Sequence, residues 1–126
     1  MEFMLDTDTC IYLINRHPKM QRKAPPAQCA ISVVVLGELE RAVRRSRQPE
    51  PTVEFTARIN VIPLEDNAAR AYGYIRDHLE SAGQMIGPND LWIAAHAYAL
   101  NVALVTNNTR EFCRVPELTV TSWLDD

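Results

Sequence analysis

The segment Phe3-Met4-Leu5-Asp6-Thr7-Asp8-Thr9-Cys10-Ile11-Tyr12-Leu13-Ile14 opens the chain and joins a short apolar run to a helical pattern through an acidic residue. Residues 3–5 predict a short buried strand that ends at Asp6. The apolar positions that follow predict a helix, with Thr7 or Asp8 as its N-cap and Pro18 as its end. A buried strand that leads straight into a helix is the first unit of an alternating pattern.

The same alternation of short apolar runs and longer helical segments continues along the chain. It predicts an α/β fold with a central, mostly parallel sheet of four or five strands flanked by helices. Further strands are expected at residues 29–32, 60–64 and 102–106, with an edge strand at 118–120. No internal repeat or long linker divides the 126 residues, so one domain covering residues 1–126 is expected.

Helix signals lie between these strands. Residues 19–27, which contain Pro25-Pro26, are expected to form an exposed connection. One helix is expected to begin between Val33 and Leu36, and a short helix is expected over residues 52–58. A third should run from an N-cap at Asp66 to a stop at Gly83, and a fourth from Pro88 to about Leu100. A last, short helix is expected near Glu111.

Composition narrows the class of protein. A hydrophobic fraction of 47% with 23% charged residues is ordinary for a globular domain. No apolar run approaches the ~18 to 20 residues that a membrane span needs, and no signal peptide is recognisable, so we expect a cytoplasmic protein that does not contact a membrane. Three cysteines without a CxxC pair predict reduced, mostly buried thiols.

Three acids stand at the edges of apolar stretches: Asp6, Glu38 and Asp90. A carboxylate beside a core is costly unless something compensates it, and Mg²⁺ prefers such oxygen ligands. Because ligands collect beyond the carboxyl ends of parallel strands, the acids can meet there and support metal-dependent phosphodiester hydrolysis. Each acid also has an ordinary alternative: Asp6 could cap a helix, Glu38 could pair with Arg41, and Asp90 could stabilise its helix N-terminus.

The net charge of −3 by itself argues mildly against nucleic-acid binding, but the arginines are clustered. Arg41, Arg44, Arg45 and Arg47 lie within seven residues. Arg41 and Arg45 follow Glu38 by three and seven positions and therefore share its flank of the helix. They could form intrahelical ion pairs, or they could contact a substrate phosphate or a partner protein.

Three longer runs resemble the motifs of PIN-domain proteins, especially VapC-type toxins. The run Met4 to Ile14 resembles their opening, and Ile86-Gly87-Pro88-Asn89-Asp90-Leu91-Trp92-Ile93-Ala94-Ala95-His96-Ala97 resembles their central motif. Leu104-Val105-Thr106-Asn107-Asn108-Thr109-Arg110-Glu111-Phe112 resembles the third, and residues 32–39 are similar to the glutamate-bearing helix start. The matches occur in order and span most of the chain.

The resemblance implies a PIN-like three-layer domain with the activity of a Mg²⁺- or Mn²⁺-dependent endoribonuclease. Asp6, Glu38 and Asp90 would be its catalytic and metal-binding acids. The protein would be the toxin of a bacterial toxin–antitoxin pair, with RNA, including tRNA, as substrate. It would form homodimers and higher assemblies in the bacterial cytoplasm and would be blocked by a VapB-type antitoxin.

The chain departs from the family pattern where many PIN domains place a fourth acid, because Asn108 occupies that position. An amide offers a neutral oxygen and adds no charge. Thr106, Glu111 and Asp8 are the other candidates for the fourth position or for substrate contacts. The alternative is therefore a catalytically impaired PIN-fold module that binds RNA or an antitoxin. A phosphorelay receiver domain fits less well, since no lysine follows Lys23.

Overall fold

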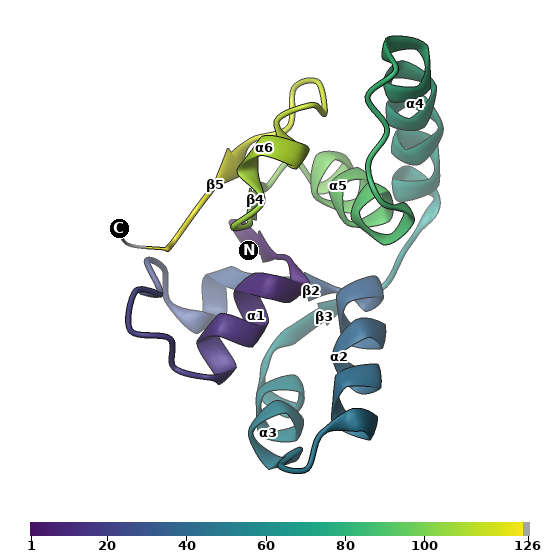
Figure 1. Cartoon of the computed structure of the whole chain (residues 1–126). Helices are drawn as coiled ribbons and strands as arrows, with labels where there is room; N and C mark the ends of the chain where they lie inside the picture. Colours follow the sequence, from purple (N-terminus) through teal and green to yellow (C-terminus); the bar gives the residue numbers. More distant parts are fainter. Residues whose placement is uncertain (125–126) are drawn as a thin grey trace.

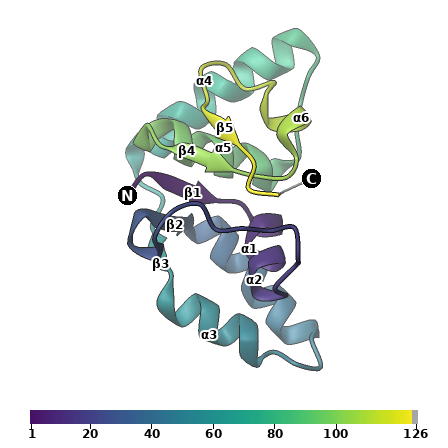
Figure 2. The same ribbon diagram turned by 90° about the vertical axis from the view of Figure 1, so that its left-hand side faces the viewer.

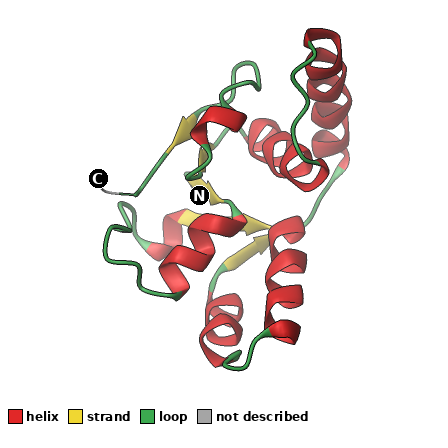
Figure 3. Ribbon diagram, in the orientation of Figure 1, coloured by secondary structure: helices red, strands yellow, loops and turns green. Residues whose placement is uncertain are grey.

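The computed structural model describes residues 1–124 and contains a five-stranded sheet at its centre. The strand order is β3-β2-β1-β4-β5, and every pair of neighbouring strands is parallel. Figure 3 shows the strands in yellow among the red helices. The strands are β1 (Phe3–Leu5), β2 (Cys29–Ser32), β3 (Asn60–Ile62), β4 (Ala103–Val105) and β5 (Val120–Thr121). The predicted α/β class with a largely parallel sheet is confirmed.

Helices form a layer on each face of this sheet (Figures 1 and 2). One layer contains α1 (Thr7–Ile14), α2 (Val33–Arg45) and α3 (Glu50–Arg58). The other contains α4 (Asp66–Ala82), α5 (Pro88–Leu100) and α6 (Thr109–Phe112). Right-handed crossovers produce this division, because the chain moves from β1 outward to β3 and then returns to β4 on the opposite side of β1.

The core lies where both layers meet the middle strands. Met4, Leu5, Ile31 and Leu104 have no solvent-exposed surface. Parallel strands covered on both faces are expected to be apolar throughout, and β2 is buried at all four positions. Helix side chains such as those of Leu39, Ile75 and Leu91 complete the core. Within residues 1–124, no helix is both long and apolar enough to cross a membrane.

The first helix begins differently from the prediction. Asp6, and neither Thr7 nor Asp8, is the N-cap of α1, because its backbone is still extended and its carboxylate accepts a hydrogen bond from the Thr9 amide at 2.9 Å. The helix also ends at Ile14, well before Pro18. Its C-cap is Asn15, and the next residue, Arg16, adopts a positive φ of 54°.

Other boundaries move by one or two residues. Glu65 takes the N-cap position of α4, so the predicted Asp66 cap is wrong, whereas the predicted stop at Gly83 is confirmed. Strands β3 and β4 are shorter than predicted, the edge strand β5 begins at Val120, and α3 begins at Glu50. The strand ends depend on which backbone groups find partners across the sheet, which local patterns do not specify.

The connection between α1 and β2 is not wholly exposed as predicted. It contains the short 3₁₀ helix η1 (Pro26–Gln28) and two buried residues, Met20 and Ala24. The C-terminal segment covers it: the Gln21 amide donates to the Trp123 carbonyl at 3.3 Å. All three cysteines are free; Cys10 and Cys29 are buried and Cys113 is exposed.

Candidate active site

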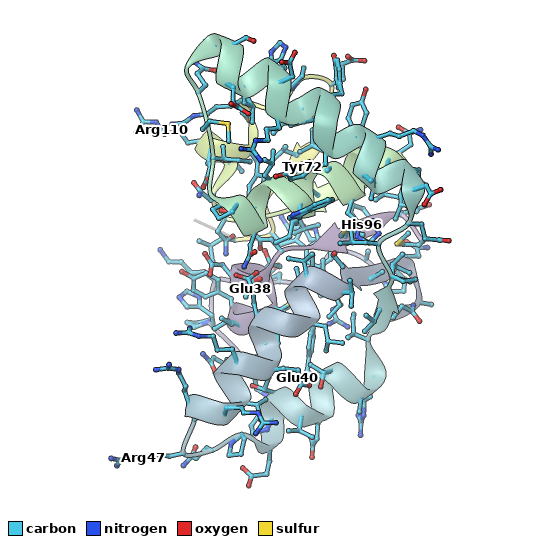
Figure 4. All side chains as sticks on the ribbon, turned by 90° about the vertical axis from the view of Figure 1, so that its right-hand side faces the viewer. Glu38, Glu40, Arg47, Tyr72, His96 and Arg110 are labelled. Atoms are coloured by element: carbon cyan, nitrogen blue, oxygen red, sulfur yellow. The ribbon has the colours of Figure 1, made fainter. Side chains whose placement is uncertain are left out.

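The three acids predicted from the sequence line one small cavity at the carboxyl ends of the central strands. Asp6 directly follows β1, and Asn108 comes shortly after β4. Glu38 reaches the cavity from α2 (Figure 4), and Asp90 lies in the first turn of α5. The cavity has a volume of about 230 Å³ and is lined by Asp6, Thr7, Asp8, Glu38, Asp90, Asn108 and Phe112.

Asp6 is the most buried of the three acids, with 5% of its surface exposed. Its amide donates to the Val105 carbonyl at 3.0 Å, which fixes the end of β1 against β4. Burial raises the pKa of Asp6 above its ordinary value, and hydrogen bonds from Thr106 and Thr9 partly oppose that rise. Asp6 therefore caps α1 and lines the cavity at the same time, so its two sequence interpretations are compatible.

Glu38 is held by α1. Its carboxylate accepts a hydrogen bond of 2.5 Å from the Thr7 hydroxyl, which lies 31 residues away in the sequence. The expected ion pair with Arg41 is absent: residues 1–124 contain two salt bridges, Arg70–Asp66 and Arg76–Glu80, and both are within α4. The interpretation of Glu38 as one half of an intrahelical ion pair is therefore wrong.

Asp90 carries the strongest electrostatic signal in the cavity. Partial burial raises the pKa of its carboxyl group, and the negative charges of Glu111, Glu38 and Asp6 raise it further, to about 7. A carboxyl group that still holds a proton near neutral pH reflects several acids sharing a confined space. A bound cation would offset the repulsion among these carboxylates, so the arrangement of charges favours cation binding.

Glu111 supplies the charge that Asn108 lacks. The Asn108 amide donates to the Glu111 carboxylate, and the Asn108 backbone amide donates to the Thr106 hydroxyl at 2.9 Å. Glu111 also accepts a hydrogen bond from the Gly87 amide at 3.1 Å, which joins α6 to the loop before α5. Of the other two candidates, Asp8 lines the cavity and Thr106 is fully buried beneath it.

A buried pair outside the cavity lining, Ser32 and His96, was not predicted as a unit. Ser32 is the N-cap of α2 and accepts from the Val34 amide at 3.1 Å, while its hydroxyl lies 2.8 Å from Nδ1 of His96. Burial lowers the pKa of His96, against an opposing backbone hydrogen bond at Pro63, so the ring is neutral. The pair joins the helix of Glu38 to the helix of Asp90. The sequence feature that could have indicated this pair is a serine directly before an apolar helix.

The Trp92 side chain packs between two helices of the same layer, α4 and α5. The Trp92 ring stacks on Tyr72 of α4, with centroids 3.9 Å apart and an interplanar angle of 19°. The Arg76 guanidinium lies 5.9 Å from the Tyr72 ring centroid. Trp92 is therefore a packing residue between α4 and α5, and its stacked face is not available to an RNA base.

The donor set fits a hard divalent cation in chemical type. Asp6, Glu38 and Asp90 offer oxygen ligands, the kind that Mg²⁺ and Mn²⁺ prefer. In the part of the chain that the structure describes, no three Asp, Glu, His or Cys side chains converge closely enough to hold a metal ion. The carboxylates would therefore have to approach one another further to bind a cation.

A parallel five-stranded sheet between two helical layers, with acids gathered at its carboxyl edge, defines the PIN-like class of α/β domains. The PIN domain family model matches residues 3–118. The chain belongs to the PIN-domain family and, within it, to the VapC ribonucleases. It is 40% identical to Ribonuclease VapC2 of Rickettsia felis and 38% identical to the tRNA(fMet)-specific endonuclease VapC of Shigella flexneri, and each alignment covers 98% of both chains.

Solved structures with the same fold include two complexes. The structure of VapBC2 from Rickettsia felis bound to a DNA fragment from the promoter matches with a TM-score of 0.81 and 36% identity, covering 98% of this chain and 99% of the other. The DNA-bound VapBC from Salmonella typhimurium matches with a TM-score of 0.83 and 33% identity, covering 98% of each chain. These similarities confirm the family predicted from the sequence motifs.

Proposed function

We propose that this protein is a metal-dependent endoribonuclease and the toxin component of a VapBC-type toxin–antitoxin pair. One observation carries the catalytic part of the proposal: Asp6, Glu38 and Asp90 come from three distant segments and line a single cavity. The raised pKa of Asp90 supports it, because clustered carboxylates destabilise one another in the absence of a cation and are typical of functional sites. Residues 1–126 would act as one catalytic domain.

Asp6, Glu38 and Asp90 would hold Mg²⁺, with Mn²⁺ as a substitute. A bound cation of this type lowers the pKa of its water and stabilises charge on a phosphodiester. The protein orients the acids through Thr9 and Thr106 at Asp6 and through Thr7 at Glu38. The Asn108 amide, already directed toward Glu111, would offer a hydrogen-bond donor to the substrate phosphate without adding a negative charge.

The substrate and the partner follow from the relatives. Because the Shigella flexneri relative is named a tRNA(fMet)-specific endonuclease, we infer that tRNA is the substrate class to test first. Because the two similar complexes are VapBC assemblies bound to DNA, we infer a VapB-type antitoxin as partner, with a toxin homodimer inside a larger assembly. Both substrate and partner would be met in the bacterial cytoplasm.

The test uses full-length protein freed of antitoxin and incubated with a tRNA pool and Mg²⁺ or Mn²⁺. We expect cleavage that chelation abolishes and that Asp6→Asn reduces by about a hundredfold or more. Asp77→Asn is the matched control, because Asp77 is an exposed residue of α4 in the opposite layer and loses the same charge. The control should cleave like the unaltered protein.

Two results would contradict the proposal. Equal cleavage by Asp6→Asn and the unaltered protein would show that the activity does not come from this cavity. RNA binding without any metal-dependent cleavage would favour the alternative of a catalytically impaired binding module, for which the neutral Asn108 is the motivating residue.

A further inference from the structure

The two halves of the chain differ in charge. Residues 1–62 contain nine lysines and arginines against seven acids, whereas residues 63–126 contain four against nine. The first group supplies α1, α2 and α3 on one face of the sheet, and the second supplies α4, α5 and α6 on the other (Figures 1 and 2). Three of the seven acids of residues 1–62, Asp6, Asp8 and Glu38, line the cavity. Residues 1–62 are therefore net basic although the chain is acidic overall. Four of their nine basic residues lie in the connection after α1, and four lie in α2 or just after it.

Four arginines concentrate this charge at one end of α2. Arg41, Arg44, Arg45 and Arg47 are all exposed, and we call them the α2 arginine cluster. The two salt bridges of residues 1–124 are both in α4, so no carboxylate of the described chain lies within 4.0 Å of the cluster. Glu40, in the same helix, does not pair with any of the four arginines. Within residues 1–124, the positive charge of the cluster is therefore not paired with any carboxylate.

The cluster begins one turn from the cavity. Glu38 lies at the cavity, and Arg41 and Arg45 follow it by three and seven residues on the same flank of α2. Four residues of helix advance about 6 Å, so these two guanidinium groups extend in line away from the acids. Figure 4 shows Glu38 in the upper half of α2 and Arg47 beyond its lower end.

Helix stability does not account for the whole cluster. Arg44 and Arg45 occupy the last turn of α2, where basic side chains interact favourably with the helix dipole. Arg41 lies before that turn and Arg47 lies after the helix has ended. The favourable dipole interaction falls off within one turn, so these two arginines need a different explanation.

Repulsion between the cavity carboxylates and an RNA backbone explains why basic residues are needed beside the cavity. A polyanion that approaches Asp6, Glu38 and Asp90 meets their negative charge, so its affinity must come from a neighbouring basic surface. Arginine binds phosphate through a planar fork of donors. We infer that the α2 arginine cluster binds backbone phosphates of the RNA substrate on one side of the bond that is cut. This inference rests on the proposed function for the substrate class.

The test separates binding from cleavage by using the Asp6→Asn protein as background. Its dissociation constant for a labelled tRNA pool is measured in Mg²⁺ buffer over a range of KCl concentrations. Adding Arg41→Gln and Arg45→Gln should weaken binding about tenfold or more and lower the slope of log Kd against log salt by about 2. Arg41→Lys with Arg45→Lys should keep the slope, because each phosphate contact keeps a cation.

The matched control is Arg70→Gln with Arg76→Gln, which removes the same charge from α4. Both arginines are already paired within α4. We expect this control to leave both the affinity and the salt slope unchanged. Thermal unfolding of every variant checks that each protein is folded. In the cleavage-competent protein, the Arg41/Arg45 pair of substitutions should raise KM and leave kcat unchanged.

Several outcomes would overturn the inference. If both pairs of substitutions change the slope equally, the effect is one of net charge; if neither does, the cluster does not contact RNA. Weaker binding of a VapB-type antitoxin with unchanged RNA binding would assign the cluster to a protein contact. Loss of the proposed nuclease activity is a separate result, since RNA binding that depends on the arginines can persist in a protein that does not cleave.

Discussion

At the scale of single residues, Asp6 shows why one side chain can satisfy two interpretations. Its carboxylate accepts the Thr9 amide and so ends β1 and starts α1, while the same side chain lines the cavity. A strand that passes directly into a helix needs a capping acceptor, and an aspartate at this point provides both a cap and an oxygen ligand. Cap and ligand could not be distinguished from the sequence because they require the same residue.

Asp90 should make the metal-free protein sensitive to pH. Its folded pKa is about 7 against an ordinary value of 3.8, so the folded state holds a proton that the unfolded chain releases between these values. Its contribution to the free energy of unfolding is fully present below about pH 3.8 and is lost as pH rises through about 7. Asp90→Asn keeps a neutral group and should remove this loss.

We expect Asp90→Asn, without metal, to gain about 1–2 kcal/mol relative to the unaltered protein between about pH 5 and about pH 8. This free energy is smaller than the full pKa shift of Asp90 would give, because the side chain is partly exposed. Chemical denaturation at both pH values measures it. Mg²⁺ should stabilise the unaltered protein at the higher pH and leave Asp90→Asn unchanged. A constant difference between the two proteins across pH would contradict the expectation.

His96 should have the opposite effect on the pH dependence of stability, lowering the free energy of unfolding as the pH falls. Burial holds its pKa below the ordinary 6.5, against the opposing negative charge of Glu65, so the folded state disfavours the proton that the unfolded chain takes up. The stabilisation is present above about pH 6.5 and is lost as pH falls. We expect the advantage of the unaltered protein over His96→Gln to shrink by about 1 kcal/mol from about pH 7.5 to about pH 5. An advantage that does not change with pH would refute a neutral, buried histidine.

At the scale of elements, α4 offers two glycines with opposite roles. Gly83 ends the helix with φ of +66°, a conformation that a side chain strains even though no atom lies within 4 Å of an added Cβ. Gly73 lies inside the same helix, exposed and with the same free space. The two positions therefore separate backbone strain from crowding, since only Gly83 needs a left-handed backbone.

We expect Gly83→Ala to lower the free energy of unfolding by about 1 kcal/mol and Gly73→Ala to raise it by about 0.5–1 kcal/mol. Urea denaturation of the two variants measures both changes, and each variant serves as the control for the other. Effects of the same sign would show that the helix end is not fixed by the conformation of Gly83.

At the scale of the whole molecule, the C-terminal segment closes the fold. Trp123 is 2% exposed, and its ring meets Phe3 of β1 edge to face, with centroids 5.7 Å apart. The same segment pairs with the connection after α1 through a bridge between Met20 and Leu124. The two ends of the described chain therefore share one core, as expected of a single cooperative domain.

We expect Trp123→Ala to destabilise the protein by about 3–5 kcal/mol, because a large buried ring is replaced by a cavity. Val53→Ala is the control; Val53 is 48% exposed, and its loss should cost less than about 0.5 kcal/mol. Far-UV circular dichroism and fluorescence should give coincident transitions for the unaltered protein. Two separate transitions would contradict the proposed single domain.

The succession of strands and helices along the chain, the three acids and the family motifs could be predicted because each is a local property of the sequence. Hydrophobic periodicity identifies a strand or a helix within about ten residues, and an acid at the end of an apolar run is visible without a fold. The ends of β3 and β4 were missed because they depend on backbone partners in other strands.

The sequence by itself thus determined an α/β domain of the PIN family and the acids that form its candidate site. Only the tertiary structure decided which contacts those acids make and where the basic charge lies. Thr7 binds Glu38 across 31 residues, and Ser32 binds His96 across 64. Such contacts arise from the order β3-β2-β1-β4-β5, which brings distant strand ends to one edge and places the arginine-rich helix α2 on one face. Strand order is a property of the packed sheet, so no local pattern contains it.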